Sequence, residues 1–357
     1  MLVAAKQNSH YLKYLDDNEL NRLHNDKNQE GSNLDWQFMS LWKDKYPQRK
    51  TEVLCRFGDM ARIHVTGNGL AQIYFKNGTK LRVTTDKDKG QHIGGTIVLT
   101  EKAGEHSLKW EQISSINFKS APSIIPRVKG RPLYGTITTS IGPLTGYLQW
   151  SAAKYSDHHF LKGRTPEGKT VHLKFYDIRA IEKSKSGAVV EMKSGRKLIL
   201  DRVDDLSAAH HGLVAMHPSW GKVEIDWKAF RSVVFESVAE DTGYGSYAVP
   251  RKIYGMLKTK DQQYFKGNCV FDMDEEWNFD LLEGRKDGIS YQIPFRYIRQ
   301  ITPLNAYYTK IVLQSDKVLV LGHHNDVTAR NWGAIVWQPN SQFKYIPWNN
   351  IAEIGIR

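Results

Sequence analysis

Apolar and polar residues alternate along many short stretches of the chain. This period of two predicts half-buried β-strands, because successive side chains of a strand point to opposite faces of a sheet. Residues 171–174 and 223–226 show the alternation clearly, and an aromatic residue follows each stretch, Phe175 and Trp227 respectively. The dominant expectation is therefore a chain made of β-strands.

Short turns that contain glycine separate several of these stretches and predict β-hairpins. Asn77-Gly78, between residues 71–75 and 81–83, is the strongest such signal in the chain. Two further hairpins are predicted, one joining 133–139 to 144–150 and the other joining 188–193 to 197–200.

An aromatic residue followed by apolar residues three and six positions later recurs at the ends of the alternating stretches. A spacing of three fits a single 3₁₀ turn, in which positions i and i+3 eclipse. Each instance therefore predicts a strand, one 3₁₀ turn and a second strand. The instances are Phe57-Met60-Ile63, Trp110-Ile113-Ile116, Phe175-Ile178-Ile181, Trp227-Phe230-Val233, Phe295-Ile298-Ile301 and Trp348-Ile351-Ile354.

A longer repeat contains these units. Residues 81–110, 198–227 and 319–348 align without a gap, each running from a leucine to a tryptophan. Within this alignment an aspartate coincides in all three copies, and so does a glycine: Asp88, Asp205 and Asp326, and Gly95, Gly212 and Gly333. Self-similarity at a period of about 120 residues indicates a repeat architecture.

The repeat predicts an all-β fold of tandem small β-barrels in pairs, each barrel about 55 residues long and Sm-like in layout. Residues 126–245 and 246–357 are predicted to hold two barrels each, and residues 51–125 a first repeat that is partly incomplete. A β-propeller or a set of β-sandwich repeats is the alternative. Residues 1–50 are predicted to form a helical or irregular cap, since Asp16 and Glu19 have the spacing of a capping box for a short helix.

Three motifs carry a resemblance to known proteins. They are Tyr134-Gly135-Thr136-Ile137-Thr138-Thr139, the run from Gly146 to Trp150, and the run from Phe175 to Ile181 with Lys193-Ser194-Gly195-Arg196. Together they resemble a group of uncharacterised bacterial β-repeat proteins with Sm-like small-barrel repeats. That group has no assigned activity, so the resemblance implies no catalytic residue, although its members often look exported.

The charge balance adds a preference for anionic partners. The chain carries 50 lysine and arginine residues against 38 acidic ones, a net charge of +12, which favours approach to nucleic acid, anionic lipid or acidic glycan. No stretch reaches the roughly 18 apolar residues of a membrane helix, so no membrane insertion is predicted. Residues 1–6 are too short for the apolar part of a signal peptide. The sequence is compatible with a cytoplasmic protein and also with an exported protein whose signal peptide lies ahead of this start.

Histidines lie beside the repeated aspartates and raise the question of a metal site. His210 and His211 follow Asp205, and His323 and His324 precede Asp326. Imidazole and carboxylate are common zinc ligands. The competing interpretation is that each aspartate caps a turn through backbone amides, because the aspartates repeat while the histidines shift position.

The tryptophans divide into two groups. Trp110, Trp227 and Trp348 end strands in phase with apolar residues and are predicted to be core. The others lie in or beside loops and, together with Arg330, are candidates for a binding surface: Trp220, Trp277, Trp332 and Trp337.

No catalytic motif is present, so the chain is predicted not to be an enzyme and no cofactor is predicted. Residues 272–276 carry four carboxylates in five positions and are expected to lie in an exposed loop. Two functions follow. The first is a non-enzymatic interaction or scaffold protein for a protein or envelope glycan, using several repeats for multivalent binding. The alternative is sequence-nonspecific nucleic-acid binding through basic barrel loops.

Overall fold

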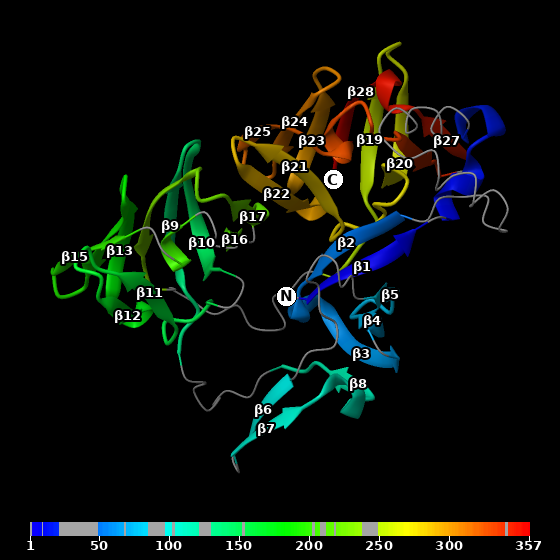
Figure 1. The fold of residues 1–357 in the computed structure, drawn as a ribbon. Helices are drawn as coiled ribbons and strands as arrows, with labels where there is room; N and C mark the ends of the chain where they lie inside the picture. Colours follow the sequence, from blue (N-terminus) through cyan, green and yellow to red (C-terminus); the bar gives the residue numbers. More distant parts are fainter. Residues whose placement is uncertain are drawn as a thin grey trace, which may run out of the picture. The chain divides into compact units, whose positions relative to one another are not determined.

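The computed structural model describes residues 2–8, 10–20, 49–67, 69–84, 97–101, 104–120, 130–151, 154–201, 204–207, 212–217, 219–237, 249–339 and 342–357. These residues form antiparallel β-sheets with short 3₁₀ turns, and one helical turn covers residues 17–20 (Figure 1). The prediction of an all-β chain is confirmed. No helix among these residues is long and apolar enough to cross a membrane.

The chain divides into two compact units. Unit 1 contains residues 1–121, 243–282 and 294–357, and unit 2 contains residues 122–242 and 283–293. The first and most of the third repeat segment therefore share a unit, although the second segment separates them in sequence.

Most of unit 2 consists of the second repeat segment. Its strands pair in the order β15-β14-β13-β18-β9-β10-β16-β17, and β11 pairs with β12. The strands are β9 (Tyr134–Thr139), β10 (Gly142–Trp150), β11 (Phe160–Arg164), β12 (Thr170–Lys174), β13 (Ile178–Lys183), β14 (Gly187–Met192), β15 (Lys197–Asp201), β16 (Leu213–His217), β17 (Gly221–Ile225) and β18 (Phe230–Phe235). The two hairpins predicted in this segment are confirmed as β9–β10 and β14–β15.

The third segment repeats this pairing scheme in the order β25-β24-β23-β28-β19-β20-β26-β27. Its strands are β19 (Tyr254–Thr259), β20 (Tyr264–Phe271), β21 (Leu281–Lys286), β22 (Ile289–Pro294), β23 (Ile298–Pro303), β24 (Tyr308–Leu313), β25 (Val318–Gly322), β26 (Ala334–Trp337), β27 (Phe343–Ile346) and β28 (Ile351–Ile356). β22 pairs with β17 inside unit 2, from Lys222↔Gln292 to Ile225↔Ile289. A strand of the third segment thus extends the sheet of the second.

The first segment forms a six-stranded sheet in the order β2-β1-β5-β4-β3-β8 and a separate β6–β7 hairpin. Its strands are β1 (Leu2–Asn8), β2 (Arg49–Cys55), β3 (Met60–Gly67), β4 (Leu70–Phe75), β5 (Lys80–Thr84), β6 (Ile97–Glu101), β7 (Gly104–Leu108) and β8 (Ser115–Asn117). β4 and β5 form the predicted Asn77-Gly78 hairpin, in which Gly78 has φ +83°. A positive φ at this position is what a glycine allows and most residues resist.

The 3₁₀ turns begin at the aromatic residues that the sequence pattern identified. They are η2 (Phe57–Asp59), η4 (Trp110–Gln112), η5 (Phe175–Asp177), η8 (Phe295–Tyr297) and η10 (Trp348–Asn350). Residues 227–229 form a hydrogen-bonded turn at the remaining instance. Two further turns, η6 (Asp204–Leu206) and η9 (Asn325–Val327), lie at the repeated aspartates.

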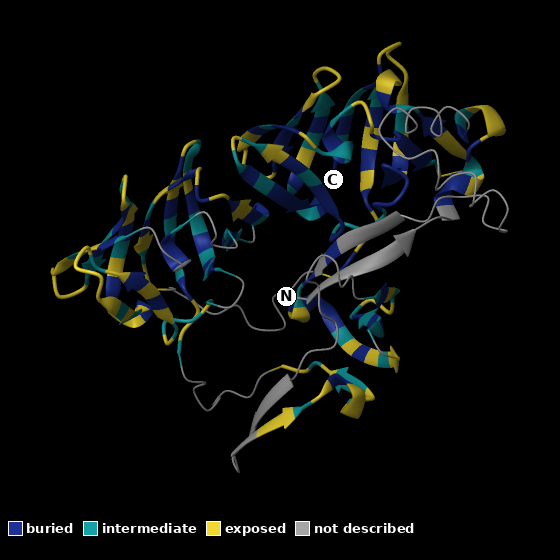
Figure 2. Cartoon of the chain, viewed as in Figure 1, coloured by how far each residue is buried: buried dark blue, intermediate teal, exposed yellow. Residues whose placement is uncertain are grey.

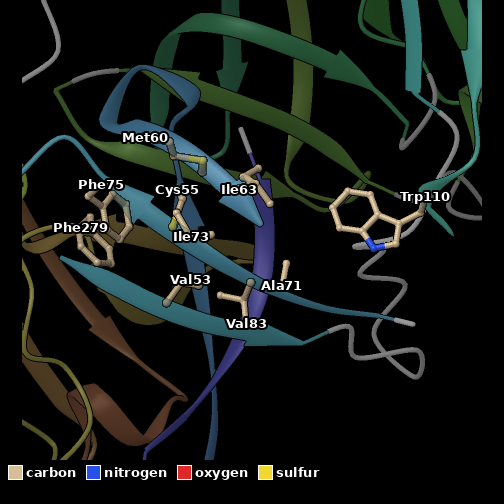
Figure 3. Close-up of a cluster of buried hydrophobic side chains, with 10 residues drawn as sticks. All are labelled: Val53, Cys55, Met60, Ile63, Ala71, Ile73, Phe75, Val83, Trp110 and Phe279. Atoms are coloured by element: carbon tan, nitrogen blue, oxygen red, sulfur yellow. The ribbon is translucent and has the colours of Figure 1, made fainter. Parts of the chain in front are cut away.

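Buried residues alternate with less buried ones along strands such as β9 and β10, as a sheet with one face on a core requires (Figure 2). Figure 3 shows the core cluster of the first segment, which includes Cys55, Met60 and Ile73. Phe279 of the third segment belongs to the same cluster and stacks on Phe75, with ring centroids 4.6 Å apart. Trp110, Trp227 and Trp348 are all buried, which confirms their prediction as core residues.

The amino-terminal segment packs on the third repeat segment within unit 1. Its 3₁₀ helix η1 (His10–Tyr14) places Tyr11 and Leu12 in a cluster with Val270 and Ile335 of strands β20 and β26. Asp16 then caps the helical turn, because its Oδ1 accepts a hydrogen bond from the Glu19 amide at 2.8 Å. The predicted helix start is confirmed.

Candidate functional site

A cavity of about 720 Å³ lies in unit 1, between η1 and the ends of strands β19, β20 and β26. This volume falls within the range of small-ligand pockets in proteins. The lining residues are Tyr11, Tyr14, Lys252, Tyr254, Gly267, Asn268, Cys269, Val270, Glu276, Trp337, Gln338 and Pro339.

One wall of this pocket is aromatic. Trp337 at the end of β26 contacts Tyr11 and Tyr14 edge-on, with ring centroids 5.8 Å and 5.4 Å away. Tyr14 also packs against Phe343 of β27 at 5.0 Å. Tyr11 is buried, whereas Tyr14 and Trp337 are half-buried and keep part of their surface accessible. The wall therefore offers apolar ring surface beside polar hydroxyl and indole groups.

The pocket also has polar lining residues. Lys252 forms an ion pair with Glu276 and also lies over the Trp277 ring, 4.8 Å from its centroid. Asn268 and Gln338 add amide groups that both donate and accept hydrogen bonds. Aromatic rings combined with amides and a charged pair suit a neutral ligand with both apolar and hydroxyl surface.

One lining residue of the pocket, Gly267, is required by the backbone geometry. β20 and β26 come so close at Gly267 that a Cβ atom there would lie 1.7 Å from the Trp337 carbonyl oxygen. Only glycine permits this approach, which fixes Trp337 against the hairpin of β19 and β20.

Two titratable groups of the pocket, Cys269 and Tyr11, are held in their neutral forms. Burial raises the pKa of the Cys269 thiol to about 12, so this sulfur is a poor nucleophile at neutral pH. Burial, with smaller contributions from Asp280 and Tyr14, also raises the pKa of the Tyr11 hydroxyl. Tyr11 therefore keeps its proton and can donate a hydrogen bond.

The four candidate tryptophans take different positions. Trp337 lines the pocket, and Trp277 lies beside it, stacked on Phe279 at 6.1 Å. Trp332 is buried, and its backbone N–H donates to Asp272 while its carbonyl accepts from the Tyr345 hydroxyl. Trp220 is buried in unit 2 and stacks on His217 at 5.8 Å. Of the proposed binding surface, Trp337 lines the pocket, and Trp277 contacts the pocket residue Lys252.

The remaining candidate, Arg330, is exposed in the loop before β26 and does not line the pocket. The residues that sequence reasoning missed are Tyr11 and Tyr14. Their spacing of three within a short apolar stretch was the available signal, but nothing in it indicates contact with Trp337, more than 300 positions away.

The predicted metal ligands do not converge within the described part of the chain. His210 and His211 lie outside the described residues. His323 is exposed and meets Tyr308 edge-on at 6.2 Å, and the Nδ1 atom of His324 lies 3.1 Å from Asp326 Oδ1. Across the described ranges, no group of three or more histidine, cysteine or acidic side chains has the arrangement of a metal site.

Asp205 makes the kind of contact that the turn-capping interpretation expects. Its Oδ2 accepts a hydrogen bond from the backbone N–H of Lys162 at 2.6 Å and forms an ion pair with Lys154. The indole N–H of Trp150 donates to the Asp205 carbonyl at 3.0 Å. This aspartate thus ties η6 to strands β10 and β11.

The acidic run at 272–276 is not an exposed loop, contrary to expectation. Asp272, Asp274 and Glu275 are all buried. The turn folds inward because Asp272 accepts the Trp332 N–H and its own N–H donates to the Gly333 carbonyl. Burial, and then the neighbouring Asp274, Asp326 and Asp272, raise the pKa of Glu275 well above its ordinary value.

Comparison with known proteins adds no assignment: no family model, no curated protein and no solved structure matches this chain.

Proposed function

We propose that this chain is a non-enzymatic binding protein whose third repeat segment takes a glycan in the pocket beside Trp337. One observation carries the proposal: the pocket is lined by the aromatic pair Tyr14 and Trp337 together with the amide side chains of Asn268 and Gln338. Sugars present apolar C–H faces and hydroxyl edges, and a pocket with ring surfaces and a few amides complements both. The neutral Cys269 thiol supports binding without covalent chemistry.

We also propose that the paired sheets are small barrels of the Sm-like type. The support is the pairing order β17-β16-β10-β9-β18, in which the turn at 227–229 precedes the last strand. Strands β11 to β15 fall between β10 and β16 in the chain, so the second barrel of each pair would be inserted into the first.

The binding proposal is tested with soluble oligomers of β-1,4-linked N-acetylglucosamine as the probe, by titration calorimetry on the full chain. We expect saturable binding that Trp337→Ala weakens by at least about tenfold, equal to roughly 1.4 kcal/mol. Asn268→Ala tests the polar side with less change to the core. Tyr155→Ala removes an aromatic side chain that is 60% exposed and outside the pocket, so this control should bind normally.

No binding to the wild-type chain would refute the proposal for this class of glycan. Equal affinity in Trp337→Ala and the control would show that any binding occurs elsewhere.

Nucleic-acid binding is the second candidate, and a specific observation favours it. Basic residues lie over exposed aromatic rings at several places: Lys193 over Tyr176 at 4.7 Å, Lys258 over Tyr264 at 5.6 Å and Lys174 over Phe160 at 5.8 Å. Basic residues with stacking rings are the usual elements of single-strand binding. A labelled oligonucleotide titrated at about 50 mM salt tests it, because counterion release makes such binding strongest at low salt. Undetectable binding there would refute it.

A further inference from the structure

Strand β8 ends its sheet, unlike its counterparts in the other two segments. β8 pairs with β3, from Arg62↔Asn117 to His64↔Ser115, and it is the last strand in the order of that sheet. β18 pairs on both sides, with β13 and β9, and β28 likewise with β23 and β19. Within the described ranges, no strand occupies the second edge of β8.

Two apolar residues, one just before this strand and one within it, are less covered than their counterparts. The pattern of an aromatic residue and two apolar residues places Ile113 at the position of Phe230 and Ile351, and Ile116 at the position of Val233 and Ile354. The four counterparts are at most 3% exposed, whereas Ile113 and Ile116 are only half-buried. In the second and third segments a strand of the same chain covers this position.

Trp110 shows a related difference. Its counterpart Trp227 packs against Trp150 at the end of β10, with centroids 6.3 Å apart. Its counterpart Trp348 packs in the same way against Phe271 at the end of β20, at 5.8 Å. Among the described residues, no aromatic residue at the end of a strand packs against Trp110 in this way. The buried indole N–H of Trp110 has no hydrogen-bond partner among the described residues.

We propose that the second edge of β8 binds a β-hairpin donated by a partner polypeptide, in the position that β9–β10 and β19–β20 occupy in the other segments. An unoccupied strand edge presents backbone N–H and C=O groups, and an added strand satisfies them while its side chains cover the apolar positions. We infer a hairpin because the chain itself fills the equivalent position with a hairpin in both other segments, β9–β10 and β19–β20.

The register of the two internal examples specifies the partner's chemistry. Gly135 pairs with Phe235 and Ile137 with Val233, and the third segment has the same arrangement. A Cβ atom at Gly135 would lie 2.1 Å from the Val234 carbonyl oxygen, and one at Gly255 would lie 2.4 Å from that of Gly355. The partner strand therefore needs glycine opposite Phe118 and an apolar residue opposite Ile116.

The test uses a labelled peptide with the sequence of residues 132–151, which includes β9 and β10, added to the full chain. Fluorescence anisotropy should show saturable binding. A matched peptide carrying Gly135→Val should bind at least about tenfold more weakly, because its side chain meets the β8 backbone. Ile116→Lys in the full chain should weaken binding in the same way.

Hydrogen exchange locates the bound peptide. Slower exchange of the amides at 113–118 supports the proposal, whereas slower exchange at 230–235 would mean that the peptide had replaced the internal hairpin and would overturn it. No binding at a peptide concentration of about 1 mM, or equal affinity for the Gly135→Val peptide, would also overturn it. Hydrogen exchange of the chain without peptide gives a further check. If residues 113–118 are already protected and lose this protection when the chain is diluted, a second copy of the chain occupies the edge, and the proposal is overturned.

Discussion

Arg296 places both terminal nitrogens of its guanidinium on the carboxylate of Asp59, 3.3 Å from Oδ1 and 3.2 Å from Oδ2. Arg56 binds the same carboxylate from its own segment, through Nε at 3.0 Å and Nη2 at 2.9 Å. The Asp59 side chain is 1% exposed and that of Arg296 10%. Burial lowers the pKa of Arg296 and the Asp59 charge opposes that shift. This ion pair joins the first repeat segment to the third.

Asp59→Asn should destabilise the protein by about 3–5 kcal/mol, because it leaves two guanidinium groups near each other with no carboxylate between them. Urea denaturation of the full chain measures the loss in the free energy of unfolding. Arg299→Gln is the matched control, since it breaks the exposed Arg299–Asp316 pair and should cost at most about 1 kcal/mol. If Asp59→Asn lowers the free energy of unfolding no more than Arg299→Gln does, the buried ion pair does not hold the two segments together.

Glu275→Gln should change how stability depends on pH. The pKa of Glu275 is raised in the folded protein, so its contribution to stability is complete below the unfolded pKa and is lost as pH rises through the folded pKa. The variant lacks this loss and keeps a hydrogen-bonding group of the same shape. Above about pH 4.5 its stability relative to wild type should therefore increase with pH, by up to about 1.4 kcal/mol per unit.

Thermal denaturation from pH 4 to pH 8 measures this difference. Glu182→Gln, at an exposed position of β13, serves as the control and should show no such trend. A constant difference between Glu275→Gln and wild type over this range would contradict the buried, protonated state of Glu275.

Gly267→Ala should destabilise unit 1 by about 1–3 kcal/mol, because a Cβ atom would lie 1.7 Å from the Trp337 carbonyl oxygen. Separation of β20 from β26 at this point should also weaken any ligand binding beside Trp337. Gly67→Ala is the control, since its Cβ atom would meet only the Leu70 side chain, at 3.8 Å. Equal unfolding midpoints for the two variants would show that the close approach of β20 and β26 is not required.

Both cysteines should resist thiol reagents in the native protein. Cys55 and Cys269 are buried, and burial raises the pKa of Cys269 to about 12, so little thiolate forms at neutral pH. A chromogenic disulfide reagent should react with neither thiol in buffer and with both in guanidinium. Rapid reaction of Cys269 in buffer would reveal frequent opening of β20, and comparison with Cys269→Ser would identify which thiol reacts.

Much of the local structure of this protein could be predicted from its sequence. Alternating strands, the Asn77-Gly78 hairpin and the turns at Phe57, Trp110 and Phe175 were all predicted, because each depends on residues within a few positions of one another. The burial of the aligned tryptophans followed from their phase with neighbouring apolar residues. The N-cap at Asp16 is a local feature of the same kind.

Which of these elements meet depends on long-range contacts that the sequence pattern does not reveal. The pairing of β1 with β2, the packing of Tyr11 and Tyr14 on Trp337, and the contact of Asp59 with Arg296 all join residues far apart in sequence. Such contacts leave no periodic signal in either partner. The acidic run at 272–276 illustrates the limit, since its composition is typical of an exposed loop and only the backbone N–H of Trp332 and the surrounding packing draw it inside.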